Sequence, residues 1–261
     1  MIRRLAIPLL VFVVACTSSP TGRRTLKVFS DGQMSQMGIT AFDELKKETP
    51  VSNDAGAQAY VRCVANAITR EIHQAGAPAS WEVVVFQDDT ANAFALPGGK
   101  IGVHTGLFKV ATNQDQLATV IGHEVAHVLA GHSNERASTQ MATSGLRQVL
   151  ETLSGPASPA KSRTLAVLGA GAQVGVILPF SRAQESEADV LGLDLMASAG
   201  FDPREGPALW ENMAKLGGAP PELLSTHPSS STRIAALRER VKSALPIAEK
   251  ARAAGKQPRC G

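Results

Sequence analysis

The pattern His-Glu-x-x-His at residues 123 to 127 is the part of this sequence best suited to chemistry. On a helix, side chains four positions apart lie on one face, so His123 and His127 can bind one metal ion together. Glu124 can then act as a general base on a water molecule at that metal. Zinc hydrolases use this set of groups. The pattern therefore predicts one zinc ion, although two core histidines on an amphipathic helix would have the same spacing.

A catalytic zinc site needs a third protein ligand and an open position. His132 is close in sequence, but on a helix that continues past His127 its side chain would face away, at about 100° per residue. Glu185 and Asp189 lie four positions apart in a later segment with a helical pattern. One of these carboxylates can bind the metal, and the other can accept the distal N–H of a ligand imidazole. Glu187 lies between them and is expected to point elsewhere.

The elements that must position these residues follow from hydrophobic periodicity and turn signals. Short β-branched and aromatic runs predict three strands, the last two forming a hairpin. The polar segment 133–163 is expected to form a mobile excursion near the site, with a lid as one candidate role. The apolar run 164–178 is short for a membrane span and is expected to be a buried helix packed through its glycines. Helices are expected at about 25–47, 55–75, 114–130, 181–198, 202–215 and 232–245, and strands at 81–86, 94–96 and 100–105.

Residues 1–15 have the features of a bacterial lipoprotein signal peptide. Two arginines precede an apolar run from Leu5 to Val14, which is too short to span a membrane, and Cys16 follows. In signals of this kind the peptide is removed before the cysteine, which then carries lipid. Residues 16–24 would be a polar tether to the outer membrane, facing the periplasm of the bacterial envelope. The alternative is an ordinary secretory signal in which Cys16 is incidental.

Composition narrows the class of protein and its compartment. The formal net charge is only +3 and no basic block is present, so nucleic acid is not an expected partner. Hydrophobic residues make up 44% of the chain but aromatic residues only 4%, which predicts an aliphatic core. If Cys16 carries lipid, Cys63 and Cys260 remain, and an oxidising compartment favours a disulfide between them. Two free thiols are the alternative.

These motifs together resemble a family, the membrane-associated zinc metalloendopeptidases. It includes the CAAX-prenyl endopeptidases, the Oma-type mitochondrial peptidases and small bacterial periplasmic members. The resemblance covers roughly residues 55–245, which leaves 25–54 as an N-terminal helical segment and 246–261 as a C-terminal tail. It is carried by Asn-Ala-Phe-Ala-Leu-Pro-Gly-Gly at 92–99, Thr-Gly-Leu at 105–107, the His-Glu-Val-Ala-His helix, Ser181-Arg182, and Ser-Thr-His-Pro at 225–228.

The resemblance implies a zincin-like metalloprotease domain of the α+β class, mainly helical, with a small β-sheet beside the zinc-binding helix. It assigns Glu185 as the third zinc ligand and places Asp189 behind the ligands. It also implies that His227 and Arg233 approach the site and hold the substrate or its oxyanion. The chain lacks the multiple membrane spans of the prenyl-protein members, which favours soluble polypeptide substrates that face the envelope.

The sequence therefore predicts a zinc-dependent endopeptidase that cleaves unfolded or misassembled envelope proteins, with envelope assembly machinery as a further candidate partner. An extended substrate is expected to pair with an edge strand. The alternative is an envelope chaperone or assembly lipoprotein whose zinc site is structural or latched by His227. The residues expected to bind substrate are Gly99, Lys100, Ile101, Gly102 and Val103.

Overall fold

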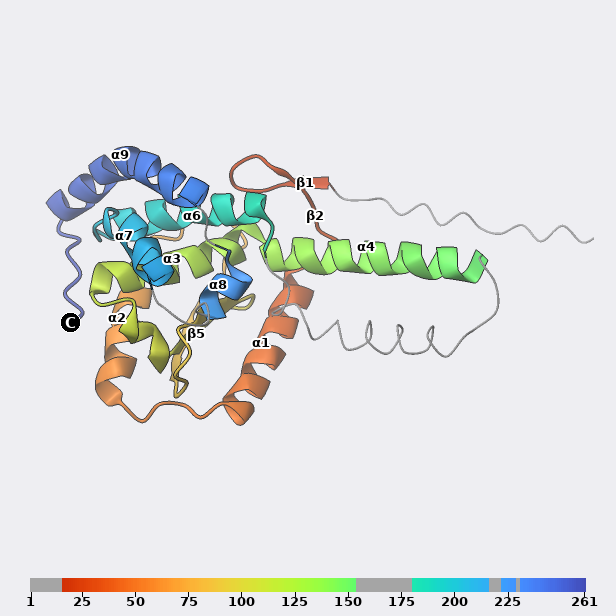
Figure 1. The fold of residues 1–261 in the computed structure, drawn as a ribbon, viewed down its shortest axis with the longest axis horizontal. Coiled ribbons are helices and arrows are strands. Elements are labelled where there is room, and N and C mark those ends of the chain that lie inside the picture. The colour runs from red at the N-terminus through yellow and green to blue at the C-terminus, as the bar shows by residue number, and fades with distance from the viewer. Residues whose placement is uncertain (1–15, 154–179, 216–221, 229–230) are drawn as a thin grey trace, which may run out of the picture.

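The computed structural model describes residues 16–153, 180–215, 222–228 and 231–261. The predicted signal peptide, the apolar run 164–178 and the part of the excursion after residue 153 lie outside them. Within the described residues, helices predominate around a small sheet (Figure 1), which confirms the α+β, mainly helical class. The helices are α1 (Asp31–Glu48), α2 (Ala55–Thr69), α3 (Gln114–Ala130), α4 (His132–Leu153), α6 (Arg182–Ser198), α7 (Glu205–Lys215), α8 (Glu222–Thr226) and α9 (Ser231–Ala253), with a short 3-10 helix at Thr105–Lys109.

Three strands form the sheet beside α3: β3 (Glu82–Phe86), β4 (Ala93–Leu96) and β5 (Lys100–His104), in the order β3-β5-β4. The predicted hairpin of β4 and β5 is confirmed, and β3 runs parallel to β5 on its other side. The expectation that a substrate pairs with Gly99 to Val103 is therefore wrong, because both edges of β5 are already hydrogen-bonded. On the hairpin side of β5, the outer strand of the sheet is β4.

Helix α3 is the central element of the fold and is buried along almost its whole length. Asn113 caps its first turn by accepting a hydrogen bond from the backbone N–H of Gln116. Gly131 ends it in the left-handed conformation, with φ of 70°. The sheet, α2, α6 and α7 all pack against α3. Its polar residues are therefore placed in the interior, where each of them needs a partner.

Two glycines let α3 and α6 approach each other closely. A Cβ atom built on Gly192 would lie 2.7 Å from the backbone nitrogen of His123, and one on Gly122 would lie 2.8 Å from the carbonyl oxygen of Gly192. No side chain fits at either position without moving the backbone. The contact lies next to His123, so it sets how near α6 comes to the predicted metal ligands.

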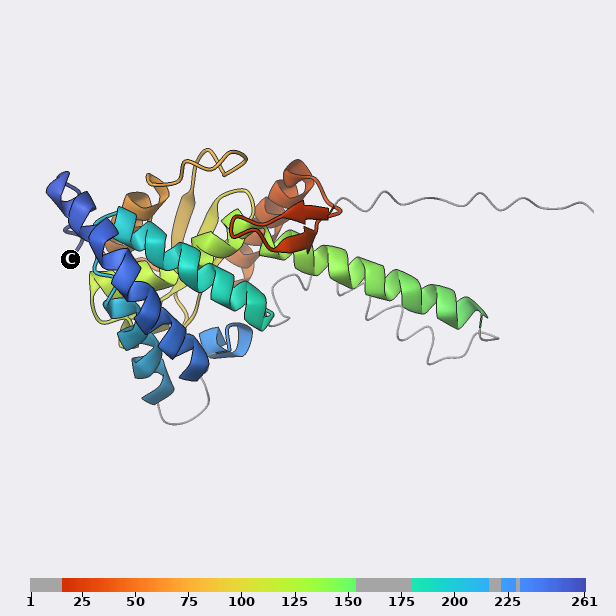
Figure 2. The same ribbon diagram turned by 90° about the horizontal axis from the view of Figure 1, so that it is seen from above.

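The N-terminal residues form a hairpin on the body of the molecule (Figure 2). Strands β1 (Cys16–Ser18) and β2 (Arg24–Leu26) are antiparallel, with Thr17 opposite Thr25. The expectations of a tether over 16–24 and of a helix starting at residue 25 are both wrong here. Small polar residues suit a tether and a tight hairpin equally, and contacts to distant residues decide between them.

The C-terminal residues also differ from the prediction. Helix α9 does not stop at Leu245 but continues through Pro246 to Ala253. Ala248 and Ala251 are buried beyond the proline, and their packing offsets the hydrogen bond that proline cannot donate. Residues 246–261 are thus not a free tail, since the predicted pair Cys63 and Cys260 forms a disulfide that joins α2 to the chain end.

Two other helices have unexpected lengths. Helix α2 ends at Thr69, six residues before the predicted end. Helix α4 is continuous for 22 residues where only helical pieces were expected, and it projects away from the rest of the molecule in both views (Figures 1 and 2).

Substituting Gly192→Ala should separate α3 from α6. The added methyl group overlaps backbone atoms that cannot move independently, so we expect a loss of about 1–3 kcal/mol in the free energy of unfolding. Zinc affinity should fall with it, because the ligands come from both helices. Gly32→Ala in α1 is the control, since its Cβ would meet nothing closer than 4.0 Å. Guanidinium denaturation and zinc titration measure both effects; equal behaviour of the two variants would contradict this account.

Candidate metal centre

Helix α3 contributes the first group of side chains. His123, Glu124 and His127 are all buried, with exposed fractions of 3%, 3% and 2%. The two histidines lie one turn apart on one helical face, as their spacing predicts, and their Nε2 atoms lie 3.0 Å apart. Two imidazole nitrogens that face each other so closely in an apolar interior form a natural pair of metal donors.

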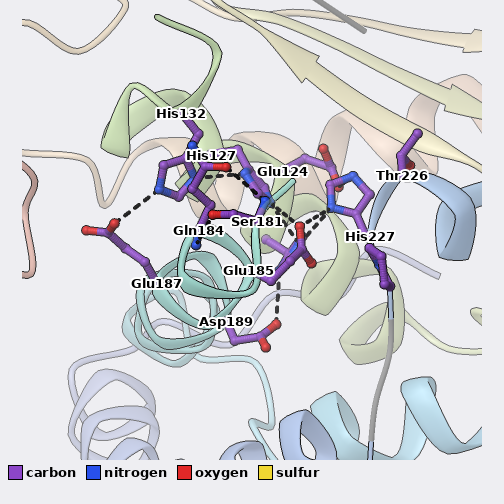
Figure 3. Close-up of polar contacts among 12 residues, drawn as sticks. Glu124, His127, His132, Ser181, Gln184, Glu185, Glu187, Asp189, Thr226 and His227 are labelled. Atoms are coloured by element: carbon purple, nitrogen blue, oxygen red, sulfur yellow. Dashed lines mark hydrogen bonds and ion pairs between the residues drawn. The ribbon is translucent and has the colours of Figure 1, made fainter. Parts of the chain in front are cut away.

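Helix α6 brings the second group from the other side. Ser181 begins this helix with a capping box, in which its side chain and that of Gln184 each bind the other's backbone N–H. This fixes the first turn, so that Glu185 faces α3 and Asp189 follows one turn later on the same face (Figure 3). The segment just after α8 supplies His227, which is also buried.

Four side chains converge with one donor atom each: His123, His127, Glu185 and His227. These atoms all lie within 4.8 Å of one another. A tetrahedral zinc ion with bonds of about 2.0–2.1 Å holds its ligand atoms about 3.3–3.4 Å apart. In the Glu185 carboxylate, Oε1 lies 3.4 Å from His127 Nε2 and Oε2 lies 3.5 Å from His123 Nε2. Both the donor types and their spacing therefore fit zinc.

His227 occupies the position expected for a fourth ligand. Its Nδ1 lies 3.2 Å from His123 Nε2 and 3.0 Å from a carboxylate oxygen of Glu185. Its other ring nitrogen, Nε2, lies 3.3 Å from Glu124 Oε1. The imidazole thus lies between the three predicted ligands and the predicted general base.

Asp189 and Arg233 lie behind the donor atoms. Asp189 Oδ1 is 3.1 Å from Nδ1 of His123, which fits a carboxylate that fixes the tautomer of a ligand histidine. Arg233 forms a fork with Asp189, at 2.8 and 2.7 Å, and also contacts Glu185 at 2.7 Å. It further donates to the carbonyl oxygen of Pro228 at 2.8 Å. Arg233 therefore holds two carboxylates and the segment that carries His227.

His132 and Glu187 also belong to the centre, which the sequence reasoning missed. Nδ1 of His132 lies 2.8 Å from Nδ1 of His127, and its Nε2 lies 3.1 Å from Glu187 (Figure 3). The expectation that His132 faces away assumed a continuing helix, but α3 ends at Gly131 and the chain turns there. The signal was present, because a glycine between two histidines allows such a turn.

Lys100, one of the residues predicted to bind substrate, lies outside the metal centre. Lys100 forms an ion pair with Glu82 at 2.6 Å, on the sheet. Cys16 opens β1.

The protonation of the centre follows from burial and from the charges around it. Burial would raise the pKa of Glu185, but hydrogen bonds from His123, His127 and His227 outweigh it and hold that pKa well below its ordinary value. Burial would lower the pKa of His123, but Asp189 and Glu185 raise it to about 9. The His127 pKa is well below its ordinary value, chiefly because of burial. A divalent cation would balance the buried carboxylates and keep both imidazoles neutral, as ligands must be.

Glu124 differs from the other carboxylates. Burial raises its pKa, and the nearby charges of His227 and His123 offset this only in part. Its Oε1 accepts no hydrogen bond within the described residues, and Nε2 of His227 lies 3.3 Å away from it. A buried carboxylate with a raised pKa beside metal donors is suited to accept a proton.

The fold and these residues define a zincin-like metal centre: a buried His-Glu-x-x-His helix, a Glu from a second helix and a small sheet alongside. The model of peptidase family M48 matches residues 55–241, and the chain belongs to this family.

Relatives within the family have been named for their activities. The mitochondrial metalloendopeptidase OMA1 of Arabidopsis thaliana is 38% identical over 222 residues, which cover 84% of this chain and 44% of the relative. OMA1 of Schizosaccharomyces pombe is 41% identical over 162 residues, 61% of this chain and 46% of the relative. The beta-barrel assembly-enhancing protease of Escherichia coli K12 is 28% identical over 242 residues, which cover 89% of this chain and 49% of the relative. The chain thus spans about half the length of these relatives.

Over the part of the chain that the structure describes, no helix combines the length and apolar character needed to cross a membrane.

Glu185→Ala should abolish tight zinc binding, because it removes a donor atom and leaves the buried histidines without their carboxylate. Asp189→Ala should retain zinc with an affinity lowered by about 10- to 100-fold, as for other groups that orient a ligand. Equilibrium dialysis against zinc measures both. Full zinc occupancy of Glu185→Ala would move the third ligand to another residue.

Proposed function

We propose that this protein is a zinc-dependent endopeptidase of the bacterial envelope that cleaves unfolded or misassembled polypeptides. The observation that carries the proposal is the position of Glu124. A purely structural metal site needs no carboxylate beside its ligands, yet Glu124 is buried next to His123, and its Oε1 lies 3.3 Å from Nε2 of His227 without a hydrogen bond. Burying such a group is unfavourable, which favours a catalytic role over a structural one.

The chemistry follows from the order of these groups. When bound, zinc supplies a Lewis acid that polarises the scissile carbonyl and makes water a better nucleophile at neutral pH. Glu124 takes the proton of the attacking water and returns it to the leaving amine. Its raised pKa suits both steps, because the carboxyl must accept and then release a proton near the working pH.

We propose that the substrate lies along the outer edge of β4 rather than along β5. The backbone N–H of His104 donates to Asn92, and hydrogen-bonded pairs alternate in an antiparallel ladder. Ala93 and Ala95 therefore turn their backbone groups away from β5. The backbone N–H of Ala95 also contributes to lowering the Glu124 pKa, which supports the closeness of this edge to the general base. Backbone pairing would bind extended chains with little dependence on their side chains.

The envelope location rests on two lines of support. Residues 1–16 have the pattern of a lipoprotein signal with Cys16 as the lipidated residue. The Escherichia coli relative is named as a protease that enhances beta-barrel assembly, whereas the plant and yeast relatives are mitochondrial. We propose that this chain resembles the bacterial relative in its setting, anchored to the outer membrane on the periplasmic side and acting near envelope assembly machinery.

His227 is proposed to act as a latch. Its Nδ1 lies where a fourth ligand would bind, and the short helix α8 before it lies at the end of the β4 edge, since Leu223 donates to the carbonyl oxygen of Ala91. One movement of α8 would then open both the metal position and the substrate edge. A latched zinc site is also the arrangement expected for the alternative function, a chaperone or assembly lipoprotein.

Glu124→Gln should retain zinc and stability but lose proteolysis. Glutamine has nearly the same shape and cannot act as a base, so kcat/KM for casein should fall by about 10²- to 10⁴-fold. Glu44→Gln, which changes an exposed carboxylate of α1, is the control and should retain full activity. Proteolysis by Glu124→Gln above about a tenth of the wild-type rate would remove the general-base role and favour the non-catalytic alternative.

His227→Ala should retain zinc and raise basal proteolysis, because it vacates the fourth coordination position. The exposed His73→Ala provides the matched control. If His227 instead stabilises the oxyanion, the same substitution should lower kcat by about 10²- to 10³-fold, with little effect on substrate binding. Steady-state assays on an unfolded substrate distinguish the two, and a fall in kcat would refute the latch.

A further inference from the structure

The N-terminal hairpin reaches the back of the metal centre through its loop. Thr21 donates from its hydroxyl to one oxygen of Glu187 at 2.6 Å, and Arg23 donates from Nε to the other oxygen at 3.0 Å. These contacts join residues more than 160 positions apart in the chain. Glu187 is buried, with an exposed fraction of 5%, so the hairpin supplies partners that this carboxylate could not obtain from water.

Glu187 is in turn connected to a metal ligand by one intermediate residue. Its Oε2 lies 3.1 Å from Nε2 of His132, and Nδ1 of His132 lies 2.8 Å from Nδ1 of His127. A carboxylate accepts only, so His132 must donate from Nε2 and accept at Nδ1. His127 then carries its proton on Nδ1 and presents an unprotonated Nε2 to the metal. The orientation and the tautomer of His127 both follow from this chain of contacts.

We propose that Thr21 and Arg23 are positioning residues for the metal ligand His127, acting through Glu187 and His132. The inference rests on the zinc site of the proposed function and adds a role for residues that no motif marks. It makes the hairpin part of the metal centre. Because β1 begins at Cys16, the segment that would carry the lipid is linked to a zinc ligand by consecutive side-chain contacts.

A second path from Arg23 supports the same role. Its Nη1 and Nη2 donate to the two oxygens of Glu135 at 2.6 Å each, and Glu135 also accepts from Gln184 at 2.9 Å. Gln184 belongs to the capping box of α6 and precedes the ligand Glu185. One guanidinium thus contacts the carboxylate behind His127 and a carboxylate that holds the start of the helix bearing Glu185. Such a planar fork is a geometry that lysine cannot reproduce.

The electrostatics agree with a strongly held carboxylate. Burial would raise the pKa of Glu187, but hydrogen bonds from Ser19, Thr21, His132 and Arg23 lower it to about 2. Three of these four partners come from the hairpin.

The test compares zinc affinity in Arg23→Gln and Glu187→Gln, measured by competition with a chromophoric chelator. Loss of an outer partner of a ligand histidine weakens metal binding by about 10- to 100-fold, which we expect for Glu187→Gln. For Arg23→Gln we expect a loss of at least about threefold, since Thr21 still holds Glu187. The matched control is Arg240→Gln, which breaks another arginine–carboxylate pair to the same helix, with Asp194, and should bind zinc like wild type.

Two further readouts separate positioning from general stability. The visible absorption bands of the Co²⁺-substituted protein should shift in Arg23→Gln and Glu187→Gln but not in Arg240→Gln, because they report the geometry of the ligands. In the double variant, Arg23→Gln should add less to Glu187→Gln than it costs alone, since one of its two paths to the metal ligands runs through Glu187. Thermal unfolding of the metal-free proteins shows whether each variant folds.

The outcomes distinguish this inference from the proposed function. If the wild-type protein binds no zinc, the proposed metal centre fails. If it binds zinc, and Arg23→Gln and Glu187→Gln match Arg240→Gln in affinity and in cobalt spectrum, the hairpin has no positioning role and the inference is overturned. Fully additive losses in the double variant would likewise show that Arg23 does not act through Glu187.

Discussion

The close approach of α3 and α6 at Gly122 and Gly192 is the constraint on which the metal centre depends. Packed helices usually lie 8–10 Å apart, with side chains between them. Here the carbonyl oxygen of Gly192 lies only 2.8 Å from where a Cβ on Gly122 would be. Zinc ligands from two elements must hold their donor atoms about 3.3–3.4 Å apart, and a Glu side chain has a fixed reach. The glycines bring Glu185 within that reach of His123 and His127.

Given this approach, one helix organises both histidines. Glu185 and Asp189 lie on the face of α6 turned to His123, one beside the donor atoms and one behind that imidazole. Glu187 is about 200° around the helix from Glu185 and serves the other histidine through His132. This works because Gly131 ends α3 and turns His132 back beside it. The acidic residues of α6 thus divide between binding and orientation according to their positions around that helix and the turn at Gly131.

The sequence allowed prediction of those features that depend on local spacing. The helix of His123 and His127 was expected from residue 114 to residue 130 and is found there, and the β4–β5 hairpin follows from its turn residues. The place of β5 in the sheet could not be predicted, because the partner of its second edge, β3, is chosen by tertiary packing. Glu187 was expected only to point away from Glu185, and its role could not be predicted because its partners Thr21 and Arg23 are remote in the sequence.

Pro246 and the N-terminal hairpin are two further features that local sequence patterns could not predict. A proline favours a helix end when only local terms count, but the burial of Ala248 and Ala251 depends on what α9 packs against. Likewise, the composition of the N-terminal segment is typical of a linker. It forms a hairpin here, and its side chains pair with the buried carboxylate of Glu187. In both cases the deciding energy comes from residues that the local pattern does not include.

The end of α3 opposite the metal centre is held by the C-terminal segment. Buried ionic groups are unfavourable by several kcal/mol each unless fully paired, and this centre concentrates them along one helix. At the start of that helix, the side chain of Gln114 donates to the carbonyl oxygen of Pro258 and accepts from the backbone of Cys260, each at 2.9 Å. The disulfide fixes this C-terminal segment to α2, which packs on α3. Closing a loop with a sequence separation of 197 stabilises the fold by up to about 5 kcal/mol in the chain-entropy model.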